Sequence, residues 1–106
     1  MRKTFMGYAR PDGRYGVRNY VAIISTADNS NFIARRVAQM INGTIPVCPC
    51  FGRGEIGPDM DLHIKTMGGM GANPNVHSAV VVSLEPALAE KIAAVIRATG
   101  KKAETF

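Results

Sequence analysis

The stretch Gly7–Asn19, GYARPDGRYGVRN, leads directly into the apolar run Tyr20–Ser25, YVAIIS, and these two segments decide the fold. The second segment is a continuous, β-branched run between polar neighbours, which is typical of a strand buried on both faces. Proline and glycine interrupt the first segment and argue against a helix there. Asp12-Gly13 predicts a tight turn, with Gly13 at positive φ. The sequence therefore predicts a short basic hairpin or looped arm that leads into a buried strand.

Three arginines recur at every fourth position of the first segment: Arg10, Arg14 and Arg18. The planar fork of arginine binds a carboxylate or phosphate through two parallel hydrogen bonds, so the cluster predicts a binding site for an acidic substrate. The same side chains can instead hold the arm on the domain, through backbone carbonyls and acidic side chains. Residue chemistry alone favours this second interpretation, and both stay open.

Length and composition describe one soluble globular domain over residues 1–106. Hydrophobic residues make up 46% of the chain and charged residues 20%, which is ordinary for such a domain. No apolar run approaches the roughly 20 residues that span a bilayer, and no signal segment follows the basic N-terminus. We therefore expect a cytoplasmic protein that contacts no membrane. The net charge of +5 is scattered along the chain, which argues against nucleic acid and favours small organic anions.

Strand-like and helix-like patterns alternate along the rest of the chain. Strands are expected at Tyr20–Ser25, Thr44–Cys48 and Val76–Ser83, with a fourth beginning in Lys102–Phe106. Helices are expected at Phe32–Ile41, from Pro58 onward, and from Glu85-Pro86 to a stop at Gly100. This order predicts an α/β fold in three layers, with a mostly parallel, Rossmann-like or flavodoxin-like sheet. Pro46 lacks a backbone donor, so its strand is expected to be short or at an edge.

In such a sheet, ligands bind beyond the carboxyl ends of the strands. Three loops are expected there: Ser25–Asn31, Cys48–Gly57 and Ser83–Pro86. Within the second loop, Gly52–Gly57 fits the pattern G-x-G-x-x-G, which suits a phosphate at a helix N-terminus. A dinucleotide site also needs an acidic residue about 20 positions on. Glu85, the nearest candidate, lies further away, so dinucleotide binding is not favoured.

The opening motif GYxRxDGRxGxRN resembles the altronate dehydratase / D-galactarate dehydratase family. Its residues are Gly7, Tyr8, Arg10, Asp12, Gly13, Arg14, Gly16, Arg18 and Asn19, with support from Ser25-Thr26, Ala34–Arg36 and Asn73–Val76. The resemblance implies a lyase that removes water from sugar acids, and a sulfolactate sulfo-lyase subunit is a relative. It runs from about residue 5 to 100 and implies one lobe of a longer protein, with the remaining lobes or a further subunit as partners. A homo-oligomer is also open.

The family pattern implies a divalent metal, such as iron, held near cysteines and a histidine in these loops. This chain departs at each place. Asn29 stands where the first cysteine is expected, Phe51–Gly54 replaces the histidine and cysteine of the second loop, and Ser83–Glu85 keeps only the acid of the third. Because asparagine, phenylalanine and arginine cannot replace soft ligands, the same metal cannot bind in the same way. No cofactor is therefore evident from the chain.

Dehydration needs a base that removes the proton next to the carboxylate and an acid that helps the hydroxyl leave. The remaining candidates are Asp28, Glu55, His63, His77 and Glu85. By position Glu85 is the best acid/base candidate, although it also complements a helix dipole. In the middle of a helix His63 fits a packed or solvent-facing residue better than a catalytic one, and His77 fits a surface residue. The thiols of Cys48 and Cys50 are expected to be reduced.

The sequence thus predicts a domain of a sugar-acid dehydratase, acting on an altronate- or galactarate-type hydroxy acid. Arg10, Arg14, Arg18, Asn29 and Arg53 are predicted to bind the acid, and Glu85 to be catalytic. The isolated chain is expected to show no dehydration of altronate or galactarate by itself. The alternative is a non-catalytic lobe of the same fold that binds a small anion or packs on a partner, so whether the chain is an enzyme stays open.

Overall fold

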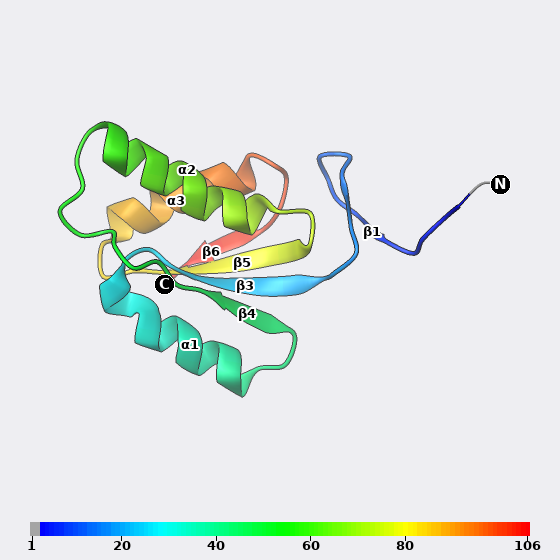
Figure 1. Ribbon diagram of the computed structural model, residues 1–106, viewed down its shortest axis with the longest axis horizontal. Coiled ribbons are helices and arrows are strands. Elements are labelled where there is room, and N and C mark those ends of the chain that lie inside the picture. Colours follow the sequence, from blue (N-terminus) through cyan, green and yellow to red (C-terminus); the bar gives the residue numbers. More distant parts are fainter. Residues whose placement is uncertain (1–2) are drawn as a thin grey trace.

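A computed structural model describes residues 3–106 (Figure 1). In chain order its main elements are β3 (Tyr20–Ser25), α1 (Asn31–Met40), β4 (Thr44–Val47), α2 (Pro58–Ala72), β5 (Val76–Val82), α3 (Pro86–Arg97) and β6 (Ala103–Thr105). A short antiparallel pair, β1 (Tyr8–Ala9) and β2 (Tyr15–Gly16), precedes them, and a 3-10 turn, η1 (Asp28–Ser30), precedes α1. The helices and strands thus alternate as the sequence predicts.

The four later strands form one parallel sheet in the order β4-β3-β5-β6. The predicted parallel pairing of the strands beginning at Tyr20, Thr44 and Val76 is confirmed, and so is the α/β class. Numbered within this sheet the order is 2-1-3-4, the order in which flavodoxin-like sheets begin. The β1–β2 pair forms a separate antiparallel sheet, so the chain as a whole is not purely Rossmann-like.

Helices cover both faces of the parallel sheet. On one face Ile24 and Val81 are fully buried beneath α2 and α3, within the larger core cluster. On the other face Ile23 and Val82 pack with Ala34 of α1 in a smaller cluster. Successive side chains of a strand point to opposite faces, which is why the continuous apolar runs are buried on both sides. Figure 1 shows α1 on one side of the sheet and α2 with α3 on the other.

Close contact between α2 and α3 explains the glycines near the end of α2. A Cβ at Gly68 would lie 2.6 Å from Val95 Cβ, and one at Gly71 would overlap Ile96 and lie 2.8 Å from Ile24 Cδ1. The helix therefore continues through its glycine-rich segment to Ala72, although glycine lowers helix propensity. None of the helices within residues 3–106 is long and apolar enough to cross a membrane.

At each edge of the parallel sheet, one residue changes the backbone hydrogen-bonding groups that the edge strand presents. Pro46 lies in β4, an edge strand, as its missing donor predicts. At the opposite edge, Arg97 donates from Nε and NH2 to the Ala103 carbonyl of β6, at 3.0 and 2.7 Å. The neighbouring Lys102 carbonyl pairs inward with β5 through Ala79, so the Ala103 carbonyl is on the outer side of the strand.

Candidate functional site

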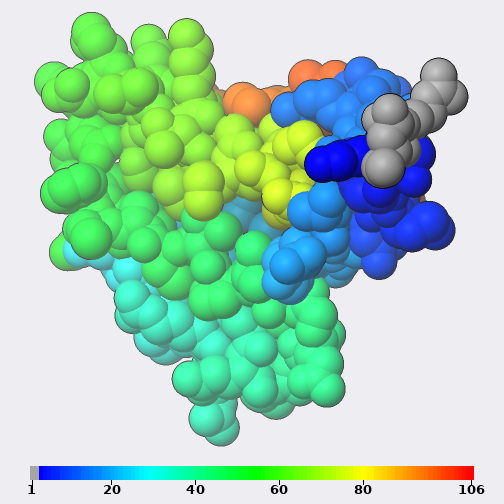
Figure 2. Space-filling model, turned by 45° about the vertical axis from the view of Figure 1, so that its right-hand side comes forward, coloured from blue at the N-terminus to red at the C-terminus, as the bar shows by residue number. Residues whose placement is uncertain are grey.

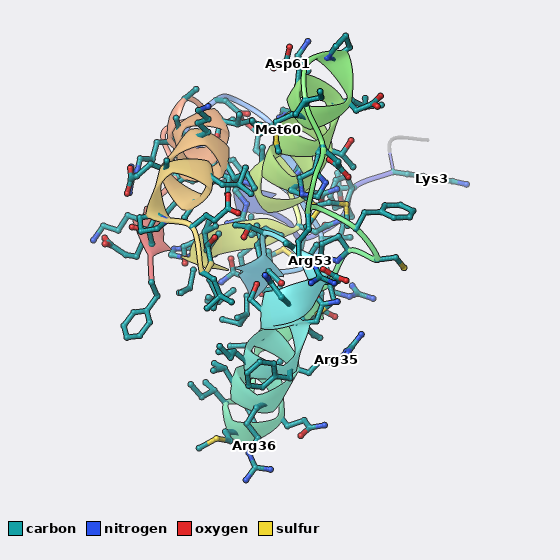
Figure 3. The ribbon with its side chains drawn as sticks, turned by 90° about the vertical axis from the view of Figure 1, so that its left-hand side faces the viewer. Lys3, Arg35, Arg36, Arg53, Met60 and Asp61 are labelled. Atoms are coloured by element: carbon teal, nitrogen blue, oxygen red, sulfur yellow. The ribbon has the colours of Figure 1, made fainter. Side chains whose placement is uncertain are left out.

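The three predicted loops meet at the carboxyl edge of the sheet, the edge that faces the viewer in Figure 3. The amide N–H of Asp28, in the first loop, donates to the Phe51 carbonyl in the second at 3.0 Å. Thr26 Oγ1, at the end of β3, donates to Ser83 Oγ, at the end of β5, at 2.7 Å. Because β4 and β5 flank β3 on opposite sides, this is the point where the strand order reverses, the usual ligand position in open α/β sheets.

A small hollow lies between the ends of β3 and β5. It measures about 10 Å³ and is lined by Asn29 and Glu85 together with Thr26 and Ser83, which is space for roughly one water molecule. The amide N–H of Glu85 donates to Ser83 Oγ at 2.8 Å, so the start of α3 is fixed on this hydroxyl. Two of the six predicted site residues, Asn29 and Glu85, are therefore brought together here.

A third predicted residue, Arg53, lies on the glycine-rich loop at the same edge (Figure 3). Its Nε and NH2 donate to the two carboxylate oxygens of Asp28, at 2.7 and 2.9 Å. This hydrogen bonding lowers the pKa of the Asp28 carboxyl below its ordinary value. The Arg53 side chain remains 64% exposed. The guanidinium of Arg53 therefore pairs with Asp28.

A larger groove of about 520 Å³ runs between α2 and the segment Cys48–Phe51. Its walls are mainly apolar, and its polar lining residues are Cys48, Cys50, Glu55, Asp59, His63 and Thr66. Burial raises the pKa of the Cys48 thiol, which donates to the Asn31 carbonyl at 3.8 Å. Cys50 is exposed, and neither cysteine is in a disulfide. Reduced thiols, carboxylates and an imidazole therefore line the same groove, beside the loop that carries Arg53.

His63 lies on the groove side of α2, not on its solvent side. The residue is 9% exposed, its Nε2 is 2.6 Å from the Thr26 carbonyl oxygen, and its Nδ1 is 3.7 Å from Glu55 Oε2. The sequence did contain a signal for this position. His63 follows Met60 by three residues and precedes Met67 by four, the spacing of one helix face.

The three arginines of the opening motif lie at the opposite, amino edge of the sheet. Arg10 is 8% exposed and donates to the carbonyls of Pro74 and Arg18, at 2.6 and 2.9 Å, and to Asn19 Oδ1 at 3.0 Å. Arg14 NH2 donates to the Ala72 carbonyl at 2.7 Å. These contacts are the ones that the second interpretation of the cluster describes. In Figure 2 the blue N-terminal segment lies at the right, and the bright green residues near position 60 lie at the left.

Arg18 differs from the other two arginines, since its NH1 donates only to the exposed Val17 carbonyl among the contacts seen, at 3.1 Å. Below the hairpin, Lys101 is 5% exposed and donates to the Asn73 carbonyl at 2.5 Å. Burial, and then the charges of Arg10 and Arg14, lower the pKa of Lys101 to about 8. The hairpin arginines therefore do not share a pocket with Asn29, Arg53 and Glu85.

Comparison with known families decides the assignment. The sequence model of the second domain of D-galactarate dehydratase/altronate hydrolase matches residues 7–106. This chain belongs to that family. The family expected from the opening motif is thereby confirmed, and the matching model describes the second domain of that family.

A relative from Chromohalobacter salexigens carries the name (2R)-sulfolactate sulfo-lyase subunit beta. It is 44% identical to this chain over 104 residues. The match takes in 98% of this chain and 27% of the relative, so the chain spans little more than a quarter of that protein. No solved structure matches the chain significantly.

The loops of this family member do not fit the metal that the resemblance implies. Within residues 3–106, no group of three or more histidine, cysteine, aspartate or glutamate side chains is placed to hold a metal ion. Asp28, the acid closest to Arg53, is already engaged by both of its oxygens. At the carboxyl edge, this chain's own residues therefore offer proton transfer and anion binding.

Proposed function

We propose that this chain is one domain of a lyase that eliminates a group from the carbon next to the acidic C–H of a hydroxy acid. The observation that carries the proposal is the family match over residues 7–106. The geometry supports it, because the loops that follow β3, β4 and β5 meet at one sheet edge and bring an arginine, an asparagine and a glutamate there. These groups are of the kinds that bind a carboxylate and move a proton.

Two substrate classes are supported, by different observations. The family description points to a sugar acid of the altronate or galactarate type, from which water leaves. The name of the relative points to sulfolactate, and its 44% identity over nearly the whole chain makes this acid the one to test first. Both substrates carry an anionic group that an exposed guanidinium can hold.

We propose different roles for the residues at the two edges of the sheet. At the carboxyl edge, Arg53 and Asn29 bind the acid, and Glu85 acts as the acid or base. At the amino edge, Arg10 and Arg14 hold the hairpin on the end of α2, because their donors already meet backbone carbonyls. A carboxylate bound by Arg18 would therefore occupy a separate site. The remaining part of the longer protein, or a further subunit, completes the pocket around the carboxyl edge.

The test is turnover of sulfolactate, altronate and galactarate by the longest natural form of this protein with its partner subunits. We expect turnover of at least one acid, and Glu85→Gln should lower kcat on the order of 100-fold, the contribution of a positioned acid or base. Glu104→Gln, an exposed glutamate on β6, is the matched control. The isolated 106-residue chain should turn over none of these acids, since positioning by the other domains is lost.

Binding of an acid without turnover, by the complete protein, would contradict the lyase proposal. That outcome would instead support a non-catalytic lobe that binds a small anion. Absence of both binding and turnover would leave partner packing as the role of this domain.

A further inference from the structure

The imidazole of His63 is among the buried polar groups that the proposed roles leave unused. Its Nε2 is 2.6 Å from the Thr26 carbonyl oxygen. A carbonyl oxygen only accepts hydrogen bonds, so Nε2 must carry a proton and donate. In a neutral imidazole the other nitrogen then has no proton, which leaves Nδ1 as an acceptor. The backbone of Thr26 therefore fixes both the orientation of the ring and its tautomer.

Glu55 is the acidic group beside Nδ1. Its Oε2 lies 3.7 Å from Nδ1, and this oxygen is buried without a hydrogen-bond partner. At 3.7 Å the two atoms are too far apart for a hydrogen bond, so the Nδ1 lone pair is not used by Glu55, and the buried Oε2 has lost water without gaining a partner. A proton on Nδ1 would offset part of that cost, because an imidazolium and a carboxylate attract each other. Nδ1 can thus accept a proton from the groove, with Glu55 placed to stabilise the charged ring.

The other groups in the groove favour His63 as the one that accepts the proton. The other titratable groups that line the same groove are Asp59, Cys48 and Cys50, and none of the described lining residues is a lysine or arginine. The Glu55 carboxylate therefore has no competing cation in the groove. Thr26 Oγ1 donates to Ser83 Oγ in the hollow that Glu85 lines. Thr26 thus contacts the imidazole through its carbonyl and also lines the hollow of the proposed acid.

We infer that His63 is the general base of the proposed elimination and that Glu55 is a positioning residue that stabilises its imidazolium form. The inference rests on the proposed function. In the step, the C–H bond next to the carboxylate breaks and its proton goes to His63 Nδ1. The electron pair of that bond forms a carbon–carbon double bond. The leaving group departs with the electron pair of its own bond to carbon, so atoms and electrons balance without an oxidant or a reductant.

The groove can admit a substrate of this kind. Its volume of about 520 Å³ lies in the range of small-molecule sites, roughly 300–1,000 Å³. The apolar walls limit water around the base, which favours transfer of the proton to it over exchange with solvent. The negative charge of Glu55 would repel an acidic substrate, whereas Arg53 on the same loop supplies the opposite charge.

The test uses the longest natural form of the protein with its partner subunits and the acid that the wild type turns over. His63→Gln keeps a donor for the Thr26 carbonyl but cannot accept the proton. We expect kcat to fall roughly 10²- to 10⁴-fold, with KM and the melting temperature nearly unchanged. Glu55→Gln should lower kcat less and also leave KM in place. His77→Gln, on the exposed start of β5, is the matched control and should behave as the wild type.

The outcomes separate this inference from the proposed function. If the wild type turns over none of the acids, the proposed function fails. If the wild type is active and His63→Gln keeps its kcat, the base role fails while the proposed function stands. If His63→Gln lowers the melting temperature enough for unfolding to account for the lost activity, His63 is a structural histidine. That result would also overturn the inference.

A second measurement does not depend on activity. Ring ¹⁵N chemical shifts of the neutral His63 ring should show a proton on Nε2 and none on Nδ1. The Glu55→Gln variant should change the Nδ1 signal much more than the Nε2 signal. A neutral ring with its proton on Nδ1 would contradict the Thr26 contact and overturn the inference.

Discussion

The two edges of the sheet use arginine in opposite ways. At the amino edge, Arg10, Arg14 and Lys101 all donate to backbone carbonyls between Gly71 and Pro74. These carbonyls belong to the end of α2 and the turn after it, where a helix leaves its last carbonyls without partners and its dipole is negative. At the carboxyl edge, the exposed Arg53 side chain meets one partly exposed carboxylate.

This difference indicates which arginine is available to bind a ligand. A buried guanidinium that satisfies several carbonyls cannot leave them without stranding buried acceptors. An exposed ion pair adds little to stability, because water screens it and both side chains lose freedom. Arg53 can therefore exchange Asp28 for an anionic ligand at small cost, whereas Arg10 cannot leave its carbonyls in this way.

The largest expected effect is on stability at the amino edge. Arg10→Met should lower the free energy of unfolding by about 3 kcal/mol, because three acceptors lose a charged donor. Arg18→Met, at an exposed arginine of the same motif, is the control and should change stability little. Urea unfolding of both variants measures the difference. Equal losses would contradict the contrast between the buried and the exposed arginine.

The next effect concerns ligand affinity at the carboxyl edge. Arg53→Ala should weaken binding of a diacid roughly ten- to hundredfold, the range for a lost charge-assisted hydrogen bond. Asp28→Asn should strengthen the same binding, because it removes the carboxylate that competes for the guanidinium. Calorimetric titration at low salt measures both. If the two variants shift affinity in the same direction, Arg53 is not the anion ligand.

A smaller effect probes the helix that connects the two edges. Gly71→Ala should lower the free energy of unfolding by about 1 kcal/mol, since overlap with Ile96 outweighs the gain in helix propensity. Gly69→Ala meets no atom within 4 Å and should stabilise the chain by up to about 1 kcal/mol. Chemical denaturation compares the pair. A stabilising Gly71→Ala would show that α2 and α3 separate easily.

The last effect is a pH dependence at the amino edge. The pKa of Lys101 is lowered by burial to about 8 from an ordinary value of 10.5. Between about pH 8 and 10.5, the unfolded chain therefore binds more protons than the folded one, and stability rises with pH in that window. Lys101→Met removes this contribution, so the wild type should gain stability over the variant between pH 7 and 10. Parallel stability curves would contradict the lowered pKa.

Much of the scaffold is predictable because its signals are local. The strand Tyr20–Ser25 has the predicted bounds, and the strands from Thr44 and Val76 each end one residue earlier than predicted. Apolar runs and helical spacing report burial directly, and the α/β class follows from their alternation. The turn at Gly13, with φ of 89°, also follows from the local sequence.

The site is less predictable because its contacts join residues far apart in the chain. Arg53 pairs with Asp28, 25 positions earlier, and His63 with the Thr26 carbonyl, 37 positions earlier. No spacing rule links such positions, since the register of the sheet brings their loops together. The roles of Arg10, Arg14, Arg18, Asn29, Arg53 and Glu85 in binding or catalysis stay predictions.

The two modified sheet edges affect how copies of this chain behave at high concentration. An open edge strand offers unpaired backbone groups that can recruit a strand from another molecule and begin aggregation. On β4 the ring of Pro46 removes a donor, and on β6 the outward carbonyl of Ala103 is occupied by Arg97. The fold thus carries its own protection against fibre growth at both ends of the sheet. Replacing either residue would expose a route to self-association without touching the ligand edge.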